Sequence, residues 1–136
     1  MARQAGRELL RGVPNADFSL VDQVSTASYE QSRRAPAVRK AFARRSACMR
    51  AKGFSYQDPM AADNDPAWNA GAKTPSRAEV ATARADVACK RRTSLVGAWW
   101  KAKAAYQERA IGDRAERFDR IRTARTRYMA NVEAHR

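Results

Sequence analysis

Two cysteines carry the most definite chemistry in this sequence. Cys48 lies in Ser46-Ala-Cys-Met-Arg-Ala-Lys-Gly53 and Cys89 in Ala85-Asp-Val-Ala-Cys89, and both segments have the composition of helices. A disulfide between them would close a long loop and stabilise the fold by roughly 4 kcal/mol, because it removes conformations of the unfolded chain. The alternative is two free thiols that pack as small apolar side chains. We predict the disulfide.

The usual catalytic constellations and metal sites are missing from the sequence. The one histidine, His135, is the penultimate residue, where no neighbour can orient it for Ser-His-Asp or Cys-His catalysis. Two cysteines outside any metal-ligand spacing also argue against zinc, and there is no glycine-rich phosphate loop. The sequence therefore predicts no catalytic residues, no metal, no cofactor and no enzymatic activity.

Aromatic and basic side chains are the candidate binding residues. Tyr56 and Trp68 fall in a stretch rich in Gly, Pro and Asp, and a long loop of this kind is either packed by its aromatics or functional. In the pair Trp99-Trp100, the simpler interpretation is two tryptophans lining the core, and the alternative is an interface anchor. Arginines recur every seven residues on one predicted helix face. The complete candidate set is Tyr56, Trp68, Trp100, Arg77, Arg84 and Arg91.

The chain is strongly basic, with a formal charge of +13 and a pI of about 10.8. Such a surface attracts acidic proteins, anionic envelope polymers or nucleic acid. The C-terminal segment contains a run of arginines that resembles a nucleic-acid arm: Arg114, Arg117, Arg120, Arg122, Arg125 and Arg127. These arginines point all round the predicted helix, and acidic neighbours offset their charge. A protein partner or an anionic envelope polymer is therefore the first prediction, and nucleic acid the second. No stretch is apolar enough for a transmembrane segment.

The composition of the chain predicts an all-α fold. Ala, Arg, Glu and Lys dominate, and β-branched residues are scattered. We predict a single domain over 1–136, with about four or five antiparallel helices around a long central helix. Its parts are N-terminal helices in 1–35, the first cysteine helix in 36–53, an irregular loop in 54–75 and a long helical segment in 76–134. That segment would be roughly 85 Å long if unbroken, so we expect either a break near 112 or an extended shape.

The helix of 37–52 should run antiparallel to the helix that begins near Ser76. Two competing starts exist for this second helix, Thr74 with Pro75 at the first position or Ser76 with Glu79 as a capping box. The apolar positions of this second helix form two adjacent faces, so we expect it to lie centrally. Behind the disulfide, Phe42 and Met49 should pack against residues such as Val87, Val96 and Trp100.

The two cysteine segments resemble an uncharacterised family of secreted or lipoprotein-like proteins of high-GC Gram-positive bacteria. In that family a CM(R/K)xxG(Y/F) segment and an (A/V)ADxxC segment recur at similar spacing, and the match covers roughly residues 38–130. The resemblance implies a helical, extracytoplasmic protein with paired cysteines, and it implies no activity.

Two functions follow as hypotheses. The first is a non-enzymatic extracytoplasmic or secreted helical module that binds a cell-envelope component or a partner protein. The second is a basic cytoplasmic helical protein that binds nucleic acid without sequence specificity. The first ten residues have no apolar stretch of the kind found in secretory signals, which indicates a cytoplasmic protein or one whose leader has been removed.

Overall fold

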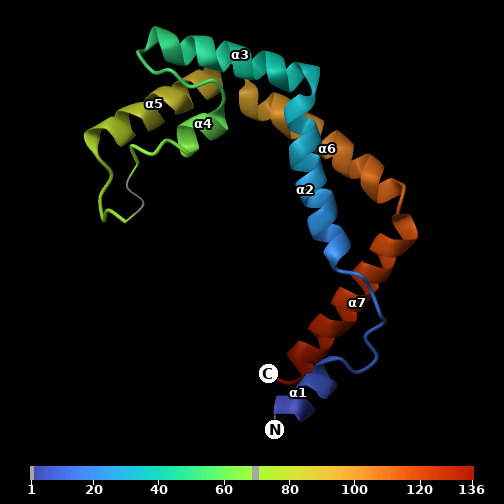
Figure 1. Cartoon of the computed structure of the whole chain (residues 1–136). Helices are drawn as coiled ribbons and strands as arrows, with labels where there is room; N and C mark the ends of the chain where they lie inside the picture. The colour runs from blue at the N-terminus through green and yellow to red at the C-terminus, as the bar shows by residue number, and fades with distance from the viewer. Residues whose placement is uncertain (1, 69–70) are drawn as a thin grey trace. The chain divides into compact units, whose positions relative to one another are not determined.

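The computed structural model describes residues 2–68 and 71–136, and within them the chain is all-α (Figure 1). The all-α prediction is confirmed, although the described residues form more than the expected four or five helices. The helices are α1 (Ala2–Leu9), α2 (Ser19–Arg34), α3 (Pro36–Ala51), α4 (Pro59–Asp63), α5 (Arg77–Arg92), α6 (Leu95–Gly112) and α7 (Ala115–Ala134).

Local sequence signals set the bounds of the two cysteine helices. α3 has Pro36 at its first position, and it ends before Gly53, whose φ of 89° suits a residue without a Cβ. α5 begins with a complete capping box, in which the Ser76 hydroxyl accepts from the backbone of Glu79 and the Glu79 carboxylate accepts from the backbone of Ser76. The capping box therefore decides between the two predicted starts.

The segment predicted as an irregular loop contains a short helix of its own. Asp58 caps α4 by accepting a hydrogen bond from the backbone N–H of Ala61 at 2.8 Å, and Pro59 occupies the first helical position. Residues 69 and 70, inside this segment, lie outside the described residues. Asp-Pro is a helix start as well as a turn signal, so composition alone did not reveal α4.

The long C-terminal segment is three helices rather than one or two. The expected break near 112 is present between α6 and α7, and a second break at Thr93 and Ser94 separates α5 from α6. Ser94 has a φ of 52°, so the helical path cannot pass straight through it. The apolar faces drawn for a continuous helix therefore do not continue from α5 into α6.

This break overturns the packing predicted behind the disulfide. Val87, Val96 and Trp100 are exposed, at 48%, 63% and 67% of their surface, and do not form the core. Leu95 is buried instead, and Trp99 packs edge-on against Phe42 with ring centroids 5.1 Å apart. The second break changes the phase of the apolar pattern after α5, so of the two tryptophans expected to line the core only Trp99 does so. Val87 precedes the break and is exposed because it lies on the side of α5 that faces away from α3.

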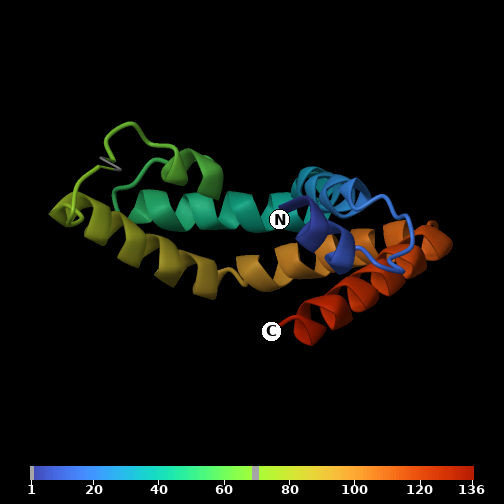
Figure 2. The ribbon, with the colours of Figure 1, turned by 90° about the horizontal axis from the view of Figure 1, so that it is seen from below.

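The chain packs as two compact units, residues 29–106 and residues 1–28 with 107–136. In the first, α3 and α5 lie side by side, and the colour gradient runs in opposite directions along them in both views, as expected for antiparallel helices (Figures 1 and 2). In the second, α7 contacts α1 through Asn131, whose amide donates to the carbonyls of Leu9 and Arg11. The single domain over 1–136 stays a prediction, because separate packing units need not unfold separately.

Candidate functional site

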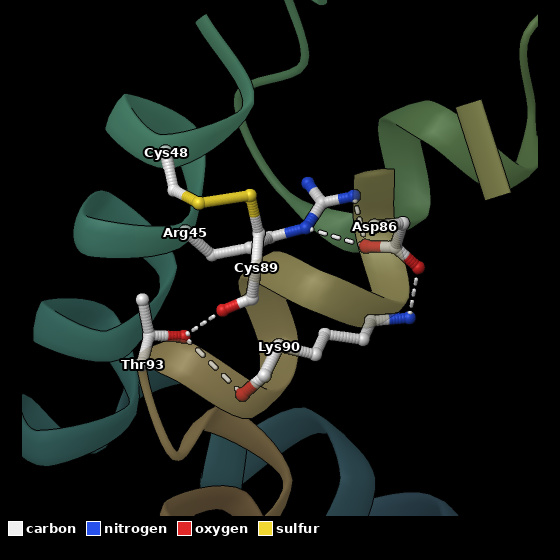
Figure 3. The surroundings of a disulfide bond; sticks show 6 residues. All are labelled: Arg45, Cys48, Asp86, Cys89, Lys90 and Thr93. Atoms are coloured by element: carbon white, nitrogen blue, oxygen red, sulfur yellow. Dashed lines mark hydrogen bonds and ion pairs between the residues drawn. A yellow bond between two sulfur atoms is a disulfide. The ribbon is translucent and has the colours of Figure 1, made fainter. Parts of the chain in front are cut away.

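A disulfide joins α3 to α5. The Sγ atoms of Cys48 and Cys89 are 2.10 Å apart and the two Cα atoms 5.7 Å apart, which confirms the predicted pair (Figure 3). Cys89 is fully buried, whereas Cys48 is half-buried. The bond therefore fixes the last turn of α3 against the last turns of α5.

A buried ion pair lies beside the disulfide. Arg45 has no exposed surface, and its Nε and Nη2 atoms both donate to Oδ1 of Asp86, at 2.8 and 2.6 Å. The second carboxylate oxygen of Asp86 forms an ion pair with Nζ of Lys90 at 2.6 Å. Figure 3 shows the Arg45 side chain passing beneath the disulfide to reach Asp86 on α5. We call Arg45, Asp86, Cys48 and Cys89 the clamp, because together they join the two helices.

A small apolar core stands behind the clamp. Met49, Ala85 and Cys89 are its buried members, and Phe54 and Tyr56 pack against it from the chain that follows α3. This arrangement ties the start of the 54–75 segment to the same pair of helices. The candidate residue Tyr56 is therefore part of the packing of the unit.

Tyr56 also closes the segment on itself. Its hydroxyl donates to Oδ2 of Asp65 at 2.6 Å, and the other oxygen of Asp65 accepts from the backbone of Ala67. The hydrogen bond to the carboxylate raises the pKa of Tyr56 above its usual 10.0, and the same bond lowers the pKa of Asp65 below its usual 3.8. Both shifts favour the carboxylate–phenol pair at neutral pH.

The tryptophans divide into two that are held internally and one that is exposed. The indole of Trp68 donates to the carbonyl of Ala62 at 2.7 Å, which folds the chain back onto α4. Trp99 donates to the Ser32 hydroxyl at 2.8 Å and packs against Phe42. Trp100 makes no such contact and presents two-thirds of its surface to solvent. Of the three aromatic candidates, the geometry leaves Trp100 most available to a partner.

The opposite face of α5 remains open. A shallow hollow of about 530 Å³ runs along this face, with an almost wholly apolar floor that includes Val80, Ala83 and Val87. Arg84 and Arg91 line it, and Arg77 is exposed one heptad earlier on the same helix. We call Val80, Ala83, Arg84, Val87 and Arg91 the outer face of α5.

The arginines of the outer face are not used in internal ion pairs. Among the described residues, Arg77, Arg84 and Arg91 form no salt bridge and no side-chain hydrogen bond. Their charges therefore stay available next to the apolar floor. The structure brings Arg84 and Arg91 together on one surface, but it does not bring Tyr56 or Trp68 to it.

The one histidine lies against the backbone at the end of α7. His135 lies 2.7 Å from the carbonyl of Asn131 through its Nδ1 atom, at the end of α7. In ranges 2–68 and 71–136, no three His, Cys, Asp or Glu side chains gather as metal ligands would. The helices within those ranges are also too short or too polar to span a membrane.

Sequence reasoning missed Arg45, the central residue of the clamp. The signal that was present is its place in the apolar pattern, because Arg45 occupies an inward position between Ala41 and Met49. Its partner is harder to find from the sequence. In antiparallel helices, positions three before each cysteine lie on opposite sides of the disulfide, and only the long Arg45 side chain brings its guanidinium to Asp86.

Comparisons with known proteins add no relative. The chain matches no protein-family model, no curated protein and no solved structure.

Proposed function

We propose that this chain is a non-enzymatic, extracytoplasmic helical module that binds an acidic partner protein through the outer face of α5. The observation that carries the proposal is the contrast between the two sides of this helix. One side is joined to α3 by the clamp, while the other leaves Val80 and Val87 at the surface beside unpaired arginines.

The disulfide supports an extracytoplasmic location. Structural disulfides persist in oxidising compartments and are rare in a reducing cytoplasm. Cys48 and Cys89 are both consumed in one bond, so no free cysteine remains for redox or metal chemistry. The resemblance of the two cysteine segments to secreted, lipoprotein-like proteins points to the same compartment.

The charge of the outer face indicates the chemistry of the partner. An amphipathic helix docks in such a groove by its apolar side, and acidic residues along its edge would pair with Arg84 and Arg91. A second copy of this chain fits poorly, because two molecules of charge +13 repel each other. A partner helix with an acidic edge is therefore the occupant that we propose.

The rival function, non-specific nucleic-acid binding, has weaker support from the same charges. Several arginines of α7 are already engaged: Arg117 with Asp17, Arg122 with Asp119, and Arg127 with the carbonyl of Arg11. Such engagement reduces the number of cations that can release counterions from a phosphate backbone.

Site-specific photo-crosslinking in the native host tests the proposal. A photoreactive amino acid in place of Val87 should crosslink to one acidic protein, and the same residue in place of the exposed Lys40 on α3 should not. Charge reversal by Arg84→Glu with Arg91→Glu should abolish the crosslink, while the matched double reversal of Arg39→Glu with Arg50→Glu, at exposed positions of α3, should leave it intact. Equal crosslinking from both positions, or crosslinking to nucleic acid alone, would overturn the proposal.

A further inference from the structure

A second surface feature lies at the Cys48 end of the disulfide, away from the outer face of α5. A hollow of about 750 Å³ is formed where the end of α3 meets the end of α5 and the residues before α6. Arg44, Lys52 and Arg92 line it, together with Cys48 and Ser94. No carboxylate is among the lining residues.

The three cationic side chains of this hollow have no partners. Among the described residues, Arg44, Lys52 and Arg92 make no ion pair and no side-chain hydrogen bond. Like charges gathered in one concavity repel each other, and an anion placed between them would remove that repulsion. Arginine presents a planar fork of donors that matches the oxygens of phosphate, and lysine adds a compact charge.

The wall of the hollow includes a residue in an uncommon backbone conformation, because Ser94 has a positive φ of 52°. As a serine among the lining residues, Ser94 adds a hydroxyl group that can donate a hydrogen bond. The disulfide is part of the same wall through Cys48, so the bond keeps Arg44 and Lys52 of the α3 end close to Arg92 of the α5 end.

We propose that this hollow binds a phosphate group, as a phosphomonoester or phosphodiester, between Arg44, Lys52 and Arg92. The site is separate from the outer face of α5, so it stands or fails independently of the proposed protein partner. The cations lie on both sides of the disulfide, and the site therefore depends on the oxidised form.

Titration of the oxidised full-length chain with inorganic phosphate, followed by backbone amide NMR at constant ionic strength, tests the site. Saturable shifts should be confined to residues 44–53 and 91–95. Arg44→Gln and Arg92→Gln should each weaken binding at least tenfold. Arg39→Gln removes the same charge from the same helix as Arg44→Gln but lies outside the hollow, and it should weaken binding less than threefold.

Two further probes distinguish the molecules that could supply the phosphate group. Poly(glycerol phosphate) that binds more tightly per phosphate than the free ion would identify an anionic polymer, and vesicles containing phosphatidylglycerol that do so would identify a lipid headgroup. Equal affinity for all three would identify the free ion. Shifts spread over every arginine-bearing face, or equal weakening by Arg39→Gln and Arg44→Gln, would overturn the site, because they would show only diffuse attraction to a basic protein.

Discussion

Arg45 and Asp86 form a buried ion pair across α3 and α5 at the same separation of 41 residues that divides Cys48 from Cys89. Each charged residue therefore lies three positions before a cysteine, on the same side of its helix. Because α3 and α5 run antiparallel, Arg45 and Asp86 lie on opposite sides of the disulfide along the helix axes, and the Arg45 side chain spans the distance between them. The ion pair and the disulfide therefore hold the same two helices together by separate contacts.

The two halves of this ion pair should differ in their effect on stability. Asp86→Asn leaves Arg45 fully buried without a carboxylate, and we expect a loss of about 3–5 kcal/mol in the free energy of unfolding. Arg45→Met should cost less than half as much, because Asp86 keeps Lys90 and some contact with solvent. The double variant should recover at least about 1 kcal/mol relative to Asp86→Asn. Urea unfolding measures all three, and equal losses in the two single variants would show that Arg45 is not held as a buried charge.

Removal of the disulfide should lower the melting temperature only where the bond can form. A loop closed over 41 positions contributes about 4 kcal/mol on the chain-entropy model. Cys48→Ser should therefore melt more than about 10 °C below the parent in oxidising buffer, and within a few degrees of it in reducing buffer. Circular dichroism provides the measurement. Identical melting of variant and parent in oxidising buffer would show that the bond is not a staple.

Tyr56 and Asp65 should make stability depend on pH at both extremes. The pKa of Asp65 is lowered by folding, so its contribution is present above about pH 4 and is lost as the pH falls through the lower, folded value. The pKa of Tyr56 is raised, so its contribution is complete below about pH 10 and is lost as the pH rises through the higher, folded value.

The Tyr56→Phe variant removes both contributions. Its melting temperature should lie below that of the parent by a constant amount between about pH 5 and 9, and the difference should narrow outside that range. Tyr106→Phe serves as the control, because the Tyr106 hydroxyl has no hydrogen bond among the described residues. A difference that stays constant from pH 2 to 11 would contradict the pairing with Asp65.

Much of the fold follows from local sequence. Pro36 and Gly53 bound α3, and Ser76 with Glu79 starts α5, because each of these signals acts through atoms within a few residues. The disulfide also follows, since two cysteines on helices offer a single pairing. The break at Ser94 does not follow, because serine has no preference for a positive φ that the sequence could reveal.

The residues of the candidate site are harder to predict from the sequence than the helix bounds. Periodicity assigned both tryptophans and Val87 to the core, but the change of phase at Ser94 leaves Trp100 exposed, and Val87, which precedes Ser94, faces away from α3. The burial of Arg45 is equally hidden, because arginine on a helix is normally solvated and only a long-range partner makes its burial tolerable. Whether these residues are buried depends on contacts between helices, which the pattern within one helix does not reveal.

The adjacent tryptophans give a direct test of that change of phase. Trp99→Ala should lower the free energy of unfolding by about 3 kcal/mol, because it removes packing against Phe42 and the hydrogen bond to Ser32. Trp100→Ala, the matched substitution at the next position, should change it by less than about 0.5 kcal/mol. Chemical unfolding measures both. A larger loss at Trp100 than at Trp99 would restore the continuous helix and contradict the break.

The central claim is that Cys48 and Cys89 are bonded in the protein as it exists in the cell. Protein recovered from its native compartment should be alkylated at once without reductant, and its intact mass then determined. We expect no alkylated cysteine, and a peptide pair joining Cys48 to Cys89 after digestion. Two alkylated cysteines would contradict the clamp, and the extracytoplasmic function proposed from it would lose its main support.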